Sequence, residues 1–404
     1  MTIYLDYQAT TPLAPEAADA MRPWLDDKFA NPHSSHRLGR EAAAAVEAAR
    51  EEIVATLLRW EPRYERRGDE ADNPPWVTET YPWDSRPESG RLFFTSGATE
   101  ALNWAIKGTF SKAPPDRRRI VTVATEHAAV LDTIRSLERF GAEVVVLPVD
   151  RKGQIDVVQA MEAVNERTAL IACMSVNNEI GVVQHIGLLR MSEVARAHGV
   201  PVICDNVQGF GRYSVNVSMC DMVAISAHKI HGPKGIGALW VRKGFEPEPL
   251  LHGGGQEGGL RSGTLSPALC AGFGAAAKLA GADPLQGAGH VMQLYHRARE
   301  ILRDAGWHMN GHRSVRWPGN LNIRRAGVDA ARLIADVRQV AFSAGSACAS
   351  GSGRPSHVLR AIGLSDAEAR SSIRLGFGRY TTEAELIEAL DLINTAAERQ
   401  LRLP

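Results

Sequence analysis

Lys229 lies in the segment SAHKIHGPKGIG, with serine and histidine before it and a Gly-Pro pair shortly after it. The preceding run MVAIS predicts a buried strand, which places the lysine at the end of a sheet, where α/β proteins bind ligands. An amine in that position can hold pyridoxal 5'-phosphate (PLP) as a Schiff base and later act as a base. A solvated loop lysine is the alternative, and Lys229 alone does not separate the two.

Two further strand ends carry groups that suit the ring of such a cofactor. Asp205 ends the run PVICD, and its carboxylate can keep a pyridine nitrogen protonated. Gln208 follows three residues later and can hydrogen-bond the ring oxygen. His127 follows the run IVTVA, where an imidazole can stack on the ring and move protons. The alternatives are a turn-forming aspartate and a capping or core histidine.

A phosphate site is predicted where TSGATEALN (95–103) follows the strand RLFF and opens a helix. Backbone N–H groups at a helix start bind phosphate well, which makes Gly97, Ala98 and Thr99 candidates. The alternative is an ordinary turn with a threonine cap. Ser226 and His228, beside Lys229, are further candidate phosphate ligands.

Cys348 and Arg374 are candidates for contact with a substrate. Cys348 lies in a run of Ser, Ala and Gly that is unsuited to a core, so we expect an exposed thiol on a mobile loop that is poised to react. An incidental surface thiol is the alternative. The planar fork of Arg374, in SSIRLGFGRY, suits a carboxylate, although a structural ion pair would also explain it.

Short apolar runs alternate with helical patterns from residue 91 to about 241. This alternation predicts an α/β fold with a mostly parallel sheet that helices cover on both faces. A helix is expected over 40–58. Residues 59–90 are rich in charge, proline and tryptophan, which predicts an irregular surface excursion that either packs on its own subunit or binds a partner. A break near residue 285 precedes a smaller lobe of helices and short strands.

Composition narrows the class of protein. The 404 residues carry a formal net charge of zero, so we expect no direct nucleic-acid partner. The start lacks the pattern of a signal peptide, and no apolar run is long enough to cross a bilayer. Five scattered cysteines, none in a CxxC pair, predict reduced thiols in the cytoplasm and no metal site.

Together these segments resemble the cysteine desulfurases, a branch of the PLP enzymes of fold type I, the aspartate-aminotransferase fold. The likeness runs through IYLDYQATTP, TSGATEALN, TEHAAVLDT, NNEIGVVQ, SAHKIHGPKGIG, RSGTLSP and SIRLGFGRYT. The run GSACASGSGRPSHVLRAIG is similar to the catalytic-loop signature, with the spacing from Cys348 to Pro355 of the long-loop group. We therefore expect a large PLP-binding domain over 13–285, with 59–90 inserted, and a smaller α+β domain from 1–12 and 286–404 that carries the cysteine loop.

The resemblance also implies roles at matching positions. They are Lys229 as the Schiff-base lysine, Asp205 and Gln208 on the ring with His127 stacked on it, Gly97, Ala98, Thr99, Ser226 and His228 at the phosphate, Thr264 at the phosphate of the neighbouring subunit, Asn178 and Arg374 at the substrate carboxylate, and Cys348 as sulfur acceptor. A homodimer with shared sites follows from the role of Thr264. Gln8, where smaller residues are usual, and the long 59–90 segment depart from the pattern.

The implied reaction converts L-cysteine to L-alanine and leaves a persulfide on Cys348 for an acceptor protein. Iron–sulfur cluster assembly, tRNA thiolation and DNA phosphorothioation all begin in this way, and the sequence does not choose among them. The alternatives are a selenocysteine lyase or another lyase or aminotransferase of the same fold, or a scaffold protein that has lost catalysis.

Overall fold

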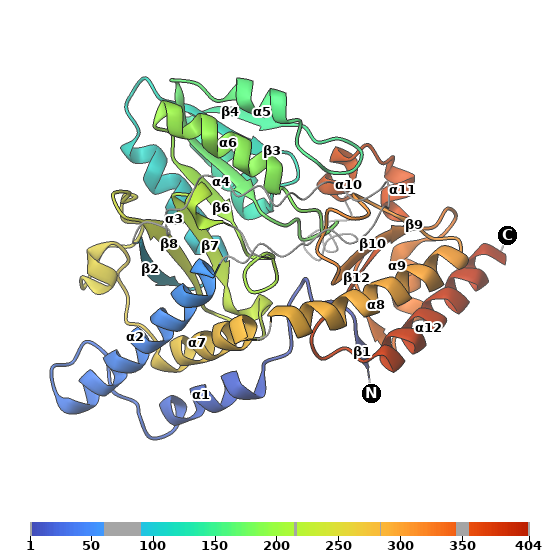
Figure 1. Cartoon of the computed structure of the whole chain (residues 1–404), viewed down its shortest axis with the longest axis horizontal. Helices are drawn as coiled ribbons and strands as arrows, with labels where there is room; N and C mark the ends of the chain where they lie inside the picture. The colour runs from blue at the N-terminus through green and yellow to red at the C-terminus, as the bar shows by residue number, and fades with distance from the viewer. Residues whose placement is uncertain (1, 60–89, 214–215, 283, 345–354, 403–404) are drawn as a thin grey trace.

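The computed structural model describes residues 2–59, 90–213, 216–282, 284–344 and 355–402 (Figure 1). Its centre is a seven-stranded sheet in the order β2-β8-β7-β6-β5-β3-β4, in which β8 alone runs antiparallel to its neighbours. The strands are β2 (Gly90–Thr95), β3 (Arg119–Val123), β4 (Glu143–Leu147), β5 (Thr168–Met174), β6 (Val202–Asp205), β7 (Met222–Ser226) and β8 (Gly237–Arg242). The predicted mostly parallel sheet of an α/β fold is confirmed.

Helices cover both faces of this sheet because its inner strands are apolar on both sides. In β5, Ile171 and Cys173 pack into one core cluster, while Leu170 and Ala172 pack into another. The first cluster includes α2 (Arg37–Leu58), α5 (Val157–Ala163), α6 (His185–His198) and α7 (Pro267–Ala282), against which α1 (Pro15–Leu25) packs. The second includes α3 (Ala98–Lys112) and α4 (Ala128–Leu137). Alternate residues of one strand therefore hold different helices.

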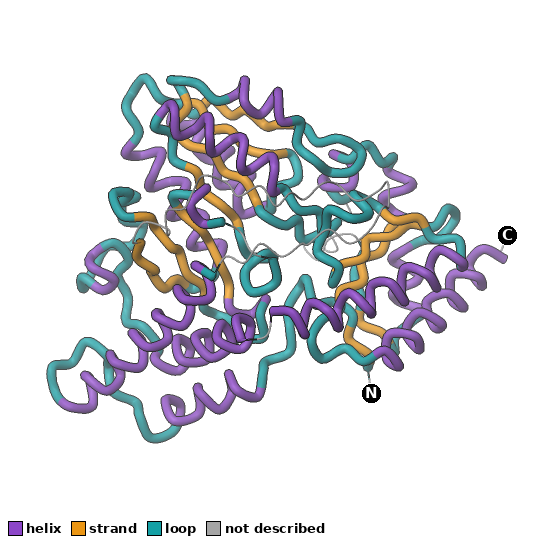
Figure 2. The backbone as a smooth tube through the Cα atoms, viewed as in Figure 1, coloured by secondary structure: helices purple, strands orange, loops and turns teal. Residues whose placement is uncertain are grey.

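A separate core cluster joins the start of the chain to its last hundred residues. Strand β1 (Ile3–Tyr4) pairs in parallel with β11 (Val340–Ala341), and β12 (Ser372–Gly376), β10 (Asn320–Arg324) and β9 (His308–Met309) form an antiparallel sheet in that order. The helices of this cluster are α8 (Pro284–Asp304), α9 (Ala330–Asp336) and α12 (Glu383–Arg402). Helices α10 (His357–Ala361) and α11 (Asp366–Arg370) pack with Ile180 and Val182 in a further cluster. Figure 2 shows α8 and α12 lying side by side along these strands. The domain limits 13–285 and 286–404 remain predictions.

Short 3-10 helices complete the described elements: η1 (Glu138–Phe140), η2 (Val217–Met219), η3 (Ala227–Lys229) and η4 (Gln256–Gly259). The predicted helix over 40–58 lies within α2, and the predicted break near residue 285 coincides with the junction of α7 and α8. Most of the predicted 59–90 excursion, with Trp60, Trp76 and Trp83, lies outside the described residues. Within the described ranges, no helix is long and apolar enough to span a membrane, and no group of His, Cys, Asp and Glu could hold a metal ion.

Candidate active site

A cavity of about 600 Å³ opens beyond the carboxyl ends of β5, β6 and β7. It is lined by most of the residues that the sequence proposed, namely Gly97, Ala98, Thr99, His127, Asn178, Asp205, Gln208, Ser226, His228, Lys229 and Arg374. The position follows from topology, because the carboxyl ends of parallel strands meet at one edge of a sheet. The volume is within the range of small-molecule sites.

Lys229 ends η3, immediately after β7, and its side chain enters the cavity. Its Nζ donates hydrogen bonds to the backbone oxygens of Gln8, at 2.6 Å, and Ala9, at 2.8 Å. Burial, together with the charges of Arg212 and Arg374, lowers the pKa of this amine to about 8 against the opposing effect of Asp6 and Asp205. Roughly a tenth of the amine is therefore uncharged at pH 7, far more than for a lysine with the usual pKa of about 10.4, and this form can act as a nucleophile or base.

Asp205 is the last residue of β6 and is buried at the cavity wall. Its Oδ1 accepts a hydrogen bond from the Val207 N–H at 3.0 Å, and no described residue hydrogen-bonds its other carboxylate oxygen. Burial raises the pKa of this carboxyl, while His127, the Val207 N–H and Lys229 act in the opposite direction. A cation in the cavity would therefore stabilise the ionised carboxylate.

His127 caps α4 and also lines the cavity. Its Nδ1 accepts the N–H of Ala129 at 3.1 Å, which fixes the ring and leaves the proton of the neutral imidazole on Nε2. Burial lowers the pKa of His127, so the ring is mainly neutral at pH 7. Helix capping and a position in the cavity, which the sequence presented as alternatives, are both true of this residue.

The start of α3 faces the cavity at the predicted phosphate site. Thr99 is exposed in the first turn, where backbone N–H groups lack helical acceptors. A Cβ on Gly237 would lie 2.7 Å from the Gly97 backbone, so glycine lets this turn approach β8 closely. Across the cavity, His228 Nδ1 lies 3.1 Å from Thr10 Oγ1, and burial lowers the pKa of His228 to about 4.

Arg374 reaches the cavity from β12, in the other part of the chain. Its guanidinium donates to Asp6 Oδ1 at 2.7 Å, to Ser343 Oγ at 3.0 Å and to the Asn178 carbonyl at 3.0 Å. The ion pair that the sequence left open is therefore present. The buried Nε of Arg374 has no hydrogen-bond partner among the described residues. Arg374 therefore forms a structural ion pair with Asp6, and its Nε–H remains available as a donor at the cavity wall.

One cation beside the lysine, the partly buried Arg212, was not found from sequence. Arg212 donates to Gln208 Oε1 at 2.6 Å and also hydrogen-bonds the Lys229 carbonyl. Gln208 Nε2 and Lys229 Nζ both donate to the carbonyl of Gln8, whose own side chain is buried. The spacing from Gln208 to Arg212 is that of one helical turn, and this was the available sequence signal. Gln8, singled out as a departure from the family pattern, proves to be a wall of the cavity.

Glu126 is a second acid that the sequence analysis missed. It is fully buried beside His127, and its Oε1 accepts the Met174 N–H at 2.5 Å. Burial raises its pKa well above the usual value, and the neighbouring Asp205 charge raises it further. We expect Glu126 to be protonated, which leaves Asp205 as the negative group of this pair.

Two predicted site residues are not brought to the cavity by the described structure. Thr264 is exposed in the turn before α7 and is absent from the cavity lining. Cys348 lies outside the described residues. Roles for both therefore remain predictions from the sequence.

The sequence profile of the class-V aminotransferases matches residues 3–65 and 86–390. The cysteine desulfurase IscS of Rickettsia bellii is 41% identical over 402 residues, covering 97% of this chain and 90% of that protein. A solved NifS-like protein covers 99% of this chain and 100% of its own, with 29% identity and a TM-score of 0.85. A structure described as SspA in complex with cysteine covers 94% and 100%, with 34% identity and a TM-score of 0.77.

The fold, the lysine at the strand end and the profile match define the class: this chain belongs to the class-V aminotransferases, which depend on PLP. Within that class it is a cysteine desulfurase, because the likeness to IscS extends over nearly the whole of both chains. These relatives favour this activity over a selenocysteine lyase or an aminotransferase. The resemblance drawn from the sequence motifs is thereby confirmed.

Proposed function

We propose that this chain uses Lys229 to move protons and Cys348 to take the sulfur from L-cysteine, which leaves L-alanine. The observation that carries the proposal is that one cavity holds both a half-buried lysine, with a pKa of about 8, and a buried aspartate of opposite charge. A desulfurase needs both groups, one to exchange protons and one to stabilise a cationic ring.

The cavity residues fit PLP. The start of α3, Ser226 and His228 would hold its phosphate, and Asp205 would face its ring nitrogen through the carboxylate oxygen that no described residue occupies. His127 would stack on the ring, and Gln208 would exchange its bond to the Gln8 carbonyl for one to the ring oxygen. When bound, PLP supplies an electron sink that makes the substrate Cα proton acidic.

Lys229 is positioned to take that proton on Nζ. Its Nζ donates hydrogen bonds to two backbone carbonyls, which hold the amine in place. An uncharged amine that donates two hydrogen bonds still has its lone pair free. Arg374 would bind the substrate carboxylate with its unused Nε, and Asn178 would support it from β5's side of the cavity. Together these contacts would orient Cα toward the amine.

Cys348 is supported as the sulfur acceptor by the state of the other thiols. Cys173, Cys204, Cys220 and Cys270 are all buried, and burial raises the thiol pKa of Cys173 and Cys270. A nucleophile must ionise and reach the substrate, which these cysteines do not satisfy. The Cys348 thiolate would attack the substrate sulfur, so that an S–S bond forms and the C–S bond breaks. The electron pair stays with the carbon skeleton, which is protonated to alanine.

The finer partner assignments belong to the same proposal. A homodimer would bring Thr264 of one subunit to the phosphate of the other, which agrees with the exposure of Thr264 and its absence from the lining of its own cavity. The persulfide would pass to an acceptor protein in the cytoplasm. Acceptors for iron–sulfur clusters, tRNA thiolation and DNA phosphorothioation all fit this chemistry.

Incubation of the purified, PLP-loaded chain with L-cysteine and dithiothreitol tests the proposal. Alanine and sulfide should appear in equal amounts, because each turnover releases one of each. L-Selenocysteine in place of L-cysteine is the comparison that separates the nearest alternative. A chain that binds PLP but forms neither product, or that acts on selenocysteine alone, would contradict the proposal.

Replacement of Asp205 by asparagine should lower the rate of alanine formation about 10³-fold while the side-chain volume stays the same. An ion pair at about 4 Å is worth about 4 kcal/mol at an effective dielectric constant near 20, and the variant loses that stabilisation of the protonated ring. The measurement is the single-turnover rate at saturating PLP. Asp221→Asn, at another buried aspartate outside the cavity, is the control for damage to the fold. A drop of less than about tenfold would remove Asp205 from this role.

Capture of PLP by the apoenzyme should accelerate as the pH rises through about 8. Only the uncharged Lys229 amine can attack the cofactor carbonyl, and its pKa of about 8 places the change there rather than near 10.5. The rate should rise with pH below 8 and become constant above it. Stopped-flow absorbance during mixing measures this profile. An inflection above about pH 10 would mean that the lysine is not buried as described.

A further inference from the structure

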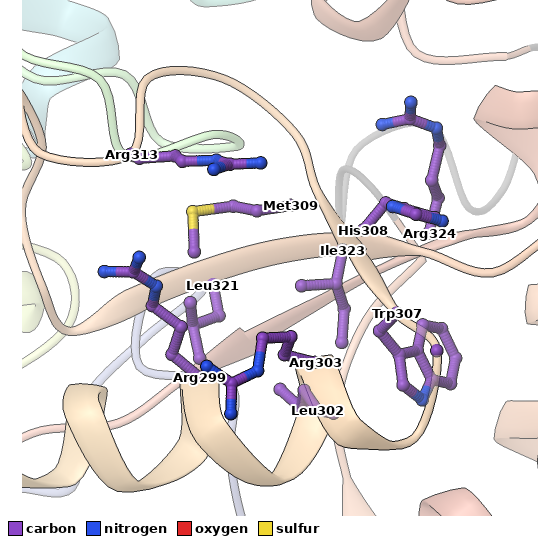
Figure 3. Close-up of a pocket in the computed structure, with 11 residues that line it drawn as sticks. Arg299, Leu302, Arg303, Trp307, His308, Met309, Arg313, Leu321, Ile323 and Arg324 are labelled. Atoms are coloured by element: carbon purple, nitrogen blue, oxygen red, sulfur yellow. The ribbon is translucent and has the colours of Figure 1, made fainter. Parts of the chain in front are cut away.

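A second cavity, of about 300 Å³, lies on the part of the chain formed by α8, β9 and β10 and shares no lining residue with the PLP cavity (Figure 3). Four arginines line it: Arg299, Arg303, Arg313 and Arg324. No aspartate or glutamate lines it. This concentration of positive charge contrasts with a formal net charge of zero for the whole chain.

The arginines surround an apolar floor. Arg299 and Arg303 rise from α8, and Arg313 extends from the opposite loop across Met309 (Figure 3). Leu302, Leu321 and Ile323 form the floor and are buried in the core cluster around α8 and α12. An occupant that matches this cavity must carry both negative charge and apolar surface.

Two of the four charges are not neutralised within the chain. Arg299 and Arg313 are exposed, and neither side chain forms an ion pair with a described residue. Burial lowers the pKa of the nearby Arg316, and the positive charge of Arg299 lowers it further. Arg299 and Arg316 therefore repel each other. Like charges in proximity cost free energy that a bound anion would offset.

The other two arginines have weak partners with simple structural explanations. Arg303 pairs with the adjacent exposed Asp304 at 2.9 Å, and it also lies in the last turn of α8, where a cation is favoured. Arg324 lies 3.5 Å from Glu368 of α11, and its guanidinium also donates a hydrogen bond to Oδ1 of the buried Asn310. Partly exposed ion pairs are worth little, so the carboxylates of Asp304 and Glu368 can be exchanged for those of a ligand.

A second hollow continues along α8 beyond the cavity, where Arg297 lies 3.3 Å from Glu300 and 3.8 Å from Glu383. This shallower hollow shares Arg299 and Arg303 and adds His296 and Arg297, with Glu300 as its one acid. The surface is therefore longer than one small anion requires. Its apolar floor also distinguishes it from a surface that binds the phosphate backbone of a nucleic acid, because such binding depends mainly on charge. Arginine forks bind carboxylates in pairs, and apolar side chains bury in a floor of this kind.

We propose that this arginine cavity binds an acidic, apolar-containing segment of the protein that accepts sulfur from this chain. The proposal rests on the proposed function only for the identity of the partner as a sulfur acceptor. The Arg324–Glu368 contact supports the location, because α11 belongs to the segment that follows Cys348 in the chain.

Fluorescence anisotropy with a short fluorescein-labelled peptide of glutamate interspersed with leucine tests the binding. The double variant Arg299→Glu/Arg313→Glu should weaken binding by at least about tenfold, since one charge-assisted hydrogen bond alone is worth that factor. Arg299→Gln/Arg313→Gln should give an intermediate loss, and added salt should weaken wild-type binding. Arg332→Glu/Arg338→Glu carries the same charge change on exposed arginines outside the cavity and should change binding less than about twofold.

Three outcomes would overturn the proposal. They are equal binding of the peptide by wild type and the Arg299/Arg313 variants, equal binding of a peptide with glutamine in place of glutamate, and tighter binding of a single-stranded oligonucleotide that the same variants abolish. The last would assign the cavity to phosphates. Alanine formation from L-cysteine with dithiothreitol, measured in parallel, should be the same in wild type and variants. If wild type forms alanine without binding the peptide, only this proposal fails; if it binds without forming alanine, only the proposed function fails.

Discussion

Lys229→Ala should abolish the visible absorbance of lysine-bound PLP and lower the rate of alanine formation about 10⁴-fold, the upper end of what a positioned general base contributes. The reason is geometric and electrostatic. The Lys229 Nζ is held by two backbone carbonyls at the end of β7, and its pKa of about 8 gives it both nucleophilic and basic character near neutral pH. Alanine at this position can supply neither property.

A second lysine makes this test selective. Lys234 lines the same cavity, so Lys234→Ala is the matched variant that should keep the absorbance. A small primary amine added to Lys229→Ala should restore part of the alanine formation, because it replaces the missing base. Retention of the absorbance in Lys229→Ala, or its loss in Lys234→Ala alone, would transfer the role to the other lysine.

Cys348→Ser should reduce sulfide formation about 10³-fold or more while PLP stays bound. A hydroxyl is of similar size but is not ionised at neutral pH, so it cannot attack the substrate sulfur as a thiolate does. The assay is sulfide release from L-cysteine with dithiothreitol, together with the absorbance of the bound cofactor. Full sulfide release by the variant would remove Cys348 from the mechanism.

Alkylation of the native protein gives an independent measurement of the same role. Iodoacetamide should modify Cys348 first, because the other four cysteines are buried, and the loss of activity should follow this modification. Mass spectrometry after partial reaction identifies the modified thiol. Activity lost while Cys348 is still unmodified would mean that a different thiol, or a general loss of structure, is responsible.

Much of the fold could be read from local pattern. The runs that became β3 and β5 to β8 are short and apolar, since both faces of these inner strands bury against helices, whereas the edge strand β4 is only partly buried. The strand ends then located Asp205, Lys229 and His127 at one edge of the sheet, where the structure places them. Cys173 and Cys204 lie in two of these strands and are buried.

The sequence by itself determined the chemical inventory of the site, because each key group ends a strand or opens a helix that local pattern reveals. The tertiary structure alone decided which distant groups meet them. Arg374 pairs with Asp6 across 368 residues, and the Lys229 amine rests on carbonyls 221 and 220 residues away. The arginine cavity likewise joins α8, β9 and β10 and has no local signature. Such contacts form when the folded chain packs together. Residues that meet in this way are far apart in the sequence, and no periodic pattern links them.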